Sequence, residues 1–247
     1  MCCVRLVLLT AVVWSVSASS SLAQAPPAEP KIWTVALSAG LALTSGNTDT
    51  STVNAAYDLV YNPQTRNVVK SDALFLRGKT EGALTANRLG LNVRDEYSLT
   101  ARAFVFGQNV YLKDEFKQID YLLAPTAGLG YKLFDTMATK LSVDGSAGGV
   151  WEKNPGFDVS SSGAVAAGEK LSQAITLTTT VTQSVTALWK TKNFDDALYT
   201  FGVGVAAAIS TRTQLKIELL DTYKNLPPLP TVQKNDVALL MAIVYKT

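Results

Sequence analysis

The sequence predicts an all-β fold: an antiparallel up-and-down transmembrane β-barrel of about twelve strands, preceded by a cleaved signal peptide. Three observations support this prediction. Apolar residues alternate with small polar residues along most of the chain, short and longer connections alternate between these runs, and only 17% of the 247 residues are charged. Period-two alternation is typical of strands with two different faces, and a soluble protein usually carries roughly 25% charged residues.

The N-terminal segment has the layout of a secretory signal peptide. Arg5 precedes an apolar run, Leu6 to Trp14, and small residues lead to a cleavage site after Ala25. A permanent membrane anchor is the alternative, but serines from Ser15 onward interrupt the roughly 20 apolar residues that a spanning helix needs. The predicted boundaries are 1–25 for the signal peptide, 26–31 for a proline-rich linker and 32–247 for the barrel.

Each run after residue 31 is interpreted as a strand because its apolar residues recur at every second position. One face of the last run carries Val237, Leu239, Met241, Ile243 and Tyr245. The same pattern sets Ile175, Leu177, Val181 and Val185 opposite Thr and Ser residues, and Tyr199, Phe201, Val203 and Val205 opposite Thr200, Gly202 and Gly204. The predicted strands, in order, are 32–44, 51–61, 68–78, 87–97, 103–113, 119–131, 139–151, 159–169, 175–188, 197–209, 214–224 and 235–246.

The connections between these strands fall into two alternating sets. The short set comprises 62–67, 98–101, 133–138, 170–174 and 210–213. The set predicted to be longer or more polar comprises 45–50, 79–86, 114–118, 152–158, 190–196 and 225–234. An even number of strands places both termini at one rim, expected to be periplasmic, and the longer loops at the outer rim.

The apolar face is predicted to point outward into lipid. A closed sheet of about twelve strands encloses more space than inward apolar side chains could fill, and the opposite face is mostly Thr, Ser, Ala and Gly. A soluble periplasmic sandwich or lipocalin-like barrel is the alternative. Aromatic residues near strand ends favour the membrane barrel, because Trp and Tyr form girdles at membrane–water interfaces. These residues are Trp33, Tyr61, Tyr97, Phe104, Tyr131, Trp151, Trp189, Tyr199, Tyr223 and Tyr245.

The composition excludes several kinds of chemistry. Histidine is absent, and both cysteines, Cys2 and Cys3, lie in the signal peptide, which removes zinc sites, disulfides and Ser-His catalysis. A Ser-Lys or carboxylate mechanism stays open, although no pair of residues stands out. The net charge of +2 comes without a cluster of Lys and Arg, so no nucleic-acid partner is expected. We expect no enzymatic activity and no cofactor or metal.

Two local patterns imitate binding motifs. Residues 202–207, GVGVAA, lie in an alternating strand with no following helix, whereas dinucleotide binding needs a helix N-terminus for the pyrophosphate. Asp114, Glu115 and Asp120 are acidic, but their spacing matches no calcium loop. We interpret them as part of a solvated loop beside a charged barrel wall.

Charged residues on the inferred lumen face are the candidate functional residues. Both signs occur, which indicates a network of paired charges that fills the lumen; the functional interpretation is a narrow, weakly selective pore. The candidates are Asp58, Lys70, Asp72, Arg88, Arg94, Glu96, Asp120, Lys140, Asp144, Lys216 and Glu218.

Four strings occur in a characteristic order: SGNT (45–48), TANR (85–88), DEFKQIDY (114–121) and PTAGLGYKL (125–133). With them, the chain resembles the salt-induced outer-membrane protein family catalogued as domain of unknown function 481, over about residues 35–247. The resemblance implies a Gram-negative outer-membrane barrel without an assigned enzymatic activity. Such barrels commonly end in an aromatic residue that the insertion machinery recognises, whereas this chain ends Tyr245-Lys246-Thr247.

The sequence therefore predicts a monomeric outer-membrane barrel that is structural or lets small solutes pass. Expected partners are outer-membrane lipid and, during biogenesis, periplasmic chaperones and the barrel-insertion machinery. The alternative is a surface binding protein or adhesin that acts through loops such as 225–234. The Leu226-Pro227-Pro228-Leu229-Pro230 stretch of this loop is stiff and apolar, which suits either contact with a partner or a lid over the barrel mouth.

Overall fold

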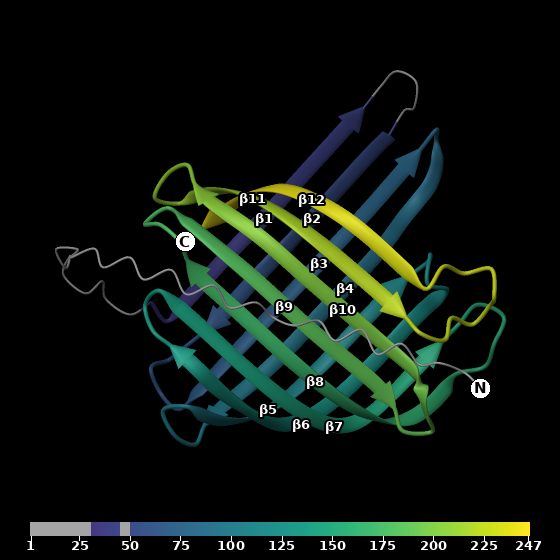
Figure 1. Ribbon diagram of the computed structural model, residues 1–247, viewed down its shortest axis with the longest axis horizontal. Helices are drawn as coiled ribbons and strands as arrows, with labels where there is room; N and C mark the ends of the chain where they lie inside the picture. Colours follow the sequence, from purple (N-terminus) through teal and green to yellow (C-terminus); the bar gives the residue numbers. More distant parts are fainter. Residues whose placement is uncertain (1–30, 45–49) are drawn as a thin grey trace, which may run out of the picture. The chain divides into compact units, whose positions relative to one another are not determined.

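A computed structural model describes residues 31–44 and 50–247, and in this part of the chain twelve antiparallel strands form a closed barrel (Figure 1). The predicted fold class is therefore confirmed. The strands are β1 (Trp33–Thr44), β2 (Thr50–Tyr61), β3 (Asn67–Thr80), β4 (Ala83–Ser98), β5 (Ala103–Asp114), β6 (Ile119–Asp135), β7 (Thr139–Lys153), β8 (Ser160–Ala174), β9 (Thr179–Lys190), β10 (Asn193–Ala208), β11 (Thr213–Lys224) and β12 (Asn235–Lys246). The predicted signal peptide, residues 26–30 and the SGNT string lie outside the described residues.

Each strand pairs with the strands before and after it in the chain, and β1 closes the barrel against β12. This closing pairing is short: its register runs over four residue pairs, from Ala36–Lys246 to Ala39–Ile243. Beyond it, the Asn54 side chain on β2 donates a hydrogen bond to the Met241 carbonyl, 3.3 Å away. Figure 1 shows β1 and β2 diverging from β11 and β12 past this point.

The barrel has two different rims. The terminal rim holds the start of β1 and the end of β12, together with connections 62–66, 99–102, 136–138, 175–178 and 209–212. The loop rim holds connections 81–82, 115–118, 154–159, 191–192 and 225–234. The second set was predicted to be longer or more polar, but connections 79–86 and 190–196 are shorter than predicted, because the strands continue into them and leave two-residue turns. Glu81 and Gly82 both have positive φ angles, 51° and 77°, as a tight hairpin turn requires.

The segment 175–178 is a turn rather than the start of a strand, so the predicted placement of Ile175 and Leu177 on a strand face was wrong. The backbone N–H groups of Ile175 and Thr176 donate to the Thr179 carbonyl, at 2.9 and 3.3 Å. The Thr176 hydroxyl accepts hydrogen bonds from the backbone N–H groups of Thr178 and Thr179. Side-chain hydrogen bonding of this kind competes with strand pairing, and the alternation of apolar and Thr residues cannot reveal it.

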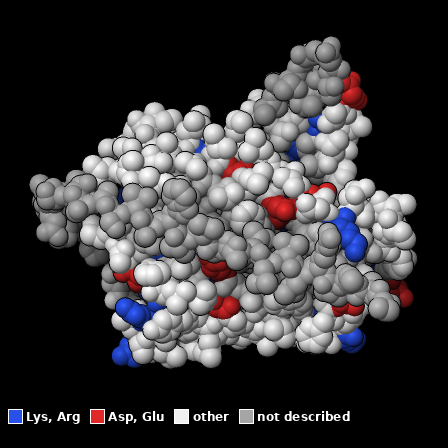
Figure 2. Space-filling model, viewed as in Figure 1, with Lys and Arg blue, Asp and Glu red and all other residues white. Residues whose placement is uncertain are grey.

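The apolar face points outward, as predicted. On β12, Val237, Leu239, Met241 and Ile243 are exposed, whereas the alternate residue Leu240 is buried. White atoms of uncharged residues cover most of the described surface in Figure 2. Among residues 31–44 and 50–247, no helix is long and apolar enough to cross a membrane.

Aromatic residues mark both rims of the outer surface, with one exception to the prediction. At the terminal rim, the Trp33 and Tyr61 rings lie 4.4 Å apart. At the loop rim, the Trp189 indole N–H donates to the Tyr199 hydroxyl at 3.0 Å. Phe104 was wrongly assigned to a girdle: it occupies an inward position and is buried. Its ring lies directly over Gly130, where a Cβ atom would come within 2.1 Å of the Phe104 ring.

Placing a cation on the outer face is expected to destabilise the barrel strongly. Leu239 lies near the middle of β12, is 56% exposed, and would face lipid. Leu239→Arg is expected to lower the free energy of unfolding in bilayers by about 2–4 kcal/mol, because Arg is costly at the bilayer midplane. Urea titration in phospholipid vesicles measures this loss, and Thr182→Arg, on the inward face of β9, is the control. Equal losses for the two variants would contradict the assignment of faces.

Candidate functional site in the barrel lumen

The inward faces of the strands form layers along the barrel axis. On several strands, the inward residue nearest the loop rim is charged and the next inward residue is apolar. The pairs are Asp114 with Leu112, Glu152 with Val150, Lys190 with Leu188, and Asp196 with Leu198. Because residues two apart share a strand face, the lumen has a charged layer at the loop rim and an apolar layer beneath it.

A second charged layer lies closer to the terminal rim, and Arg94 on β4 is its centre. The Arg94 guanidinium donates to Glu96 at 2.8 Å, to Gln108 at 2.8 Å and to Asp144 at 2.9 Å. Its central carbon lies 3.5 Å from the ring centroid of Phe106, within the range of a cation–π contact. The Lys70 ammonium joins the layer through Glu96, at 2.6 Å. We call Lys70, Arg94, Glu96 and Asp144 the inner charge layer.

The apolar layer was not predicted, because the lumen was expected to be lined by Thr, Ser, Ala and Gly. Six of its residues are buried and pack into one cluster, and three partly buried residues contact that cluster. The nine residues are Leu112, Ile119, Leu122, Ala124, Val150, Ala164, Val110, Leu188 and Leu198. The layer therefore narrows the lumen with apolar side chains on the β5 to β10 side.

Between the apolar layer and the loop rim lies a network of four charges, which we call the rim network: Glu152, Lys190, Asp196 and Lys224. Glu152 is 1% exposed, and its two oxygens contact Lys190 and Lys224, each at 2.7 Å. Asp196 contacts Lys190 at 2.6 Å and Lys224 at 3.6 Å. Burial of these charges without partners would be costly. Each acid contacts both lysines, so the charges of the four side chains cancel only when all four are present.

The loop rim is also tied across the barrel by Lys117, in the turn between β5 and β6. Its side chain is fully buried. The ammonium donates to the carbonyls of Gln233 and Lys234, at 3.0 and 2.7 Å, and contacts Asp236 at 2.9 Å. We call Lys117 and these three partners the loop latch. It fastens the end of loop 225–234 to the opposite turn.

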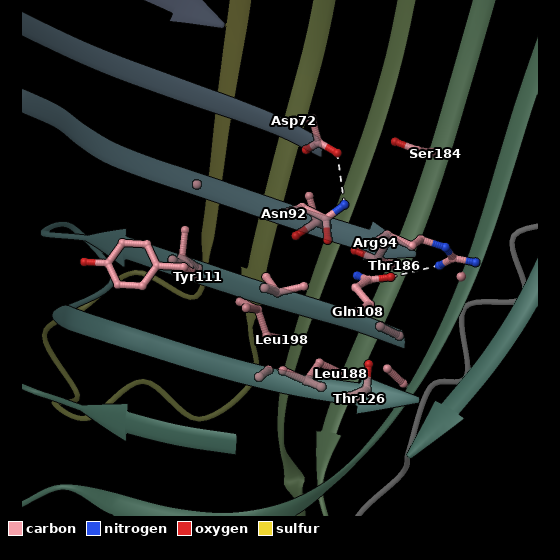
Figure 3. A pocket seen from close by; sticks show the side chains of 18 of the residues that line it. Asp72, Asn92, Arg94, Gln108, Tyr111, Thr126, Ser184, Thr186, Leu188 and Leu198 are labelled. Carbon is pink, nitrogen blue, oxygen red and sulfur yellow. Dashed lines mark hydrogen bonds between the residues drawn. The ribbon is translucent and has the colours of Figure 1, made fainter. Parts of the chain in front are cut away.

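A cavity of about 320 Å³ lies in the lumen, and its lining reaches from the inner charge layer to the apolar layer. Figure 3 shows Arg94 and Gln108 at one side of it and Leu188 and Leu198 at another. The charged residues at inward positions of its lining are Asp72, Asp144, Arg88, Arg94 and Lys170, whereas Glu169 lies on the outward face, opposite Val143 and Val185. Glu96 and Asp114, which contact Arg94 and Arg88, place two further acids beside the cavity. Within the described residues, no three Asp or Glu side chains gather as a metal site would require.

The remaining predicted lumen residues are distributed around these layers. Asp72 accepts a hydrogen bond from Asn92 at 2.9 Å, and Lys216 contacts Glu218 at 2.7 Å. Asp58 pairs with Asp72 in the β2–β3 register. Arg88 donates to the Thr222 hydroxyl and lies 3.9 Å from Asp114.

Two predicted residues are not part of these networks. Asp120 is exposed, because a register shift between Leu112 and Asp114 puts Ile119 in the buried position. Lys140 is exposed beside Asp135 near the terminal rim.

The comparisons with known proteins support the class that the fold defines. The chain is a closed antiparallel β-barrel, a fold that it shares with an outer-membrane channel. It belongs to the family of proteins of unknown function DUF481, whose model matches residues 37–247, as the sequence resemblance predicted. No curated protein matches this sequence.

A solved outer-membrane channel has a similar fold, and further outer-membrane structures align with lower TM-scores. The COG4313 outer membrane channel from Pseudomonas putida F1 aligns with a TM-score of 0.50 and 16% identity, over 91% of this chain and 100% of that one. The KdgM porin in complex with disordered oligogalacturonate aligns with a TM-score of 0.48 and 6% identity, over 86% and 98%. The translocator domain of autotransporter NalP from Neisseria meningitidis aligns with a TM-score of 0.47 and 10% identity, over 86% and 87%.

Proposed function

We propose that this protein is a monomeric, narrow and passive channel for small solutes in the outer membrane of a Gram-negative bacterium. The observation that carries the proposal is the lumen cavity of about 320 Å³, which the paired charges and the apolar layer leave unfilled. Apolar constrictions of this kind can gate a channel by excluding water. The protein would reach the membrane through a cleaved signal peptide, periplasmic chaperones and the barrel-insertion machinery. We expect no catalysis.

Planar-bilayer recording of the refolded protein tests the proposal. We expect small currents from the wild type and larger currents from a variant that lacks residues 226–233, because this loop is fastened over the loop rim by the latch. The deletion leaves both charged layers in place. Absence of current from both proteins at every voltage would exclude a channel and leave a structural role.

An adhesin or surface receptor remains the second candidate, since loop 225–234 carries the apolar stretch Leu226 to Leu229. The contact of Lys117 with this loop favours a lid. The same deletion separates the two functions. A lid predicts increased conductance, whereas an adhesin predicts lost adhesion to a partner surface with unchanged conductance.

Arg94 is expected to set the ion selectivity of the channel. Arg94→Gln removes the cation that compensates Glu96 and Asp144, so the inner charge layer becomes net negative and the current should shift toward cations. The reversal potential in a KCl gradient measures this shift. Arg102→Gln, in an exposed turn of the terminal rim, changes the same net charge outside the lumen and should leave the reversal potential unchanged. The opposite pattern would contradict this role for Arg94.

A further inference from the structure

The lumen cavity has two chemically different ends. The apolar end is formed by side chains of the apolar layer, among them Val110, Leu122, Leu188 and Leu198. Apolar cavities in proteins hold water poorly and bind apolar molecules. The volume of about 320 Å³ lies at the lower end of the range of small-molecule pockets, so a molecule with one ring or a short chain would fit.

The polar end offers an unused hydrogen-bond acceptor. The Asn92 side-chain NH₂ group donates to Asp72 at 2.9 Å, as Figure 3 shows. The Asn92 side-chain oxygen is buried and has no hydrogen-bond partner among the described residues. Buried polar atoms normally have a partner, and leaving one unpaired costs about 1–3 kcal/mol. Asn92 lines the cavity, so a rotation of its side chain toward the cavity would let a ligand donate a hydrogen bond to this oxygen and remove that cost.

The charges around the cavity indicate that the ligand is neutral. Arg94 already bonds to Glu96, Gln108 and Asp144, and Arg88 bonds to Thr222 near Asp114. The inward charges that line the cavity or contact its lining are four acids and four cations: Asp72, Glu96, Asp114 and Asp144, with Lys70, Arg88, Arg94 and Lys170. A charged ligand would lose its hydration without gaining an uncompensated counter-ion.

We infer that the lumen cavity binds a small, neutral, amphipathic molecule of the phenol or medium-chain alcohol class, with its apolar part against the apolar layer and its hydroxyl donating to Asn92. The inference extends the proposed function by naming the class of solute that the lumen holds. It concerns binding, however, so it can hold or fail whether or not the barrel conducts ions.

Photolabelling of the full-length mature barrel in nanodiscs tests the inference. The probe is a phenol that carries a diazirine, and mass spectrometry locates the labelled residues. We expect saturable labelling of Val110, Leu122 or Leu188 that excess 4-ethylphenol suppresses. Neither 4-ethylbenzoate nor 4-ethylbenzylammonium should suppress it. Labelling of Leu239, which faces lipid, should be non-saturable. Labelling confined to such outward residues, or equal suppression by the charged analogues, overturns the inference.

The hydrogen bond to Asn92 has its own test. On the wild type, 4-ethylanisole lacks the donor and should compete about tenfold more weakly than 4-ethylphenol, the effect of one hydrogen bond. On Asn92→Leu the two should compete equally. A tenfold preference that persists in Asn92→Leu rules out this position for the hydroxyl.

Filling the cavity should abolish binding. Leu188→Trp places a large ring at the apolar end, whereas Val203→Trp adds the same ring to the outer face of β10 and should leave labelling unchanged. If Leu188→Trp does not fold, as judged by its heat-modifiable gel shift, Leu198→Phe serves instead. Unchanged saturable labelling in a folded cavity-filling variant contradicts the proposed site.

Discussion

Replacing Glu152 by Gln is expected to lower the free energy of unfolding by about 3–5 kcal/mol, the usual effect of removing one member of a buried ion pair. The variant keeps the size of the side chain but removes the charge that Lys190 and Lys224 share. Lys224 is 3% exposed and would retain Asp196 only at 3.6 Å. One of two buried lysines would therefore lose its close counter-ion.

Urea-induced unfolding in phospholipid vesicles measures this loss. Glu115→Gln is a matched control, because Glu115 lies in an exposed turn at the same rim and a surface substitution should change stability by about 0.5 kcal/mol or less. The charge on Lys224 can be tested in a double-mutant cycle with Lys224→Met. If the rim network acts as a unit, the double variant loses less than the sum of the two single variants. Additive losses would show that the two side chains act independently.

The sequence predicted the barrel well because strand pairing and lipid exposure both impose a period of two. On β12, for example, the predicted and observed strands coincide at Asn235–Lys246, and its outward face is the predicted one. The predicted positions of strand ends were less accurate, because turn hydrogen bonds such as those of Thr176 are local and leave no periodic signal in the sequence. The two-residue turn at Glu81 and Gly82 could have been predicted from its Gly, since a hairpin turn needs positive φ.

The lumen networks were harder to predict than the barrel. Alternation assigns Arg94, Glu96 and Asp144 to the inward face, but it does not say that Arg94 reaches across two strands to Asp144. The rim network was missed because Glu152, Lys190 and Asp196 were assigned to the polar connections 152–158 and 190–196, where they resemble solvated loop charges. One signal was available: Glu152, Lys190 and Lys224 each lie at an inward position two residues from the end of a predicted strand or closer.

Lys117 and Asp114 show a second limit of prediction from the sequence. Both lie in the DEFKQIDY string, and the acids there were interpreted as a solvated loop. Asp114 instead bonds to the backbone N–H groups of Phe116 and Lys117, which turns the chain inward and buries Lys117. A one-residue register shift at this point changes which side chains enter the lumen, and no pattern along a single strand predicts such a shift.

Replacing Lys117 by Met is expected to release loop 225–234 and to raise the single-channel conductance. Met has nearly the length of Lys but no donor, so the Gln233 and Lys234 carbonyls and the Asp236 carboxylate would all lose their shared cation. Removing a buried lysine with three oxygen partners costs more stability than removing a surface ion pair, because its three partners are left unpaired. The inner charge layer stays intact, so ion selectivity should not change.

The rise in conductance should come from the lid, and three comparisons establish whether it does. Lys192→Met removes an exposed lysine from another turn of the same rim and should leave the conductance unchanged. Asp236→Asn removes only one partner of Lys117 and should give a smaller rise. In the variant lacking residues 226–233, Lys117→Met should add nothing further, since both changes act on the same loop. If deleting the loop raises the conductance while Lys117→Met does not, another contact holds the lid closed; if both changes add, Lys117 acts on the lumen by a separate route.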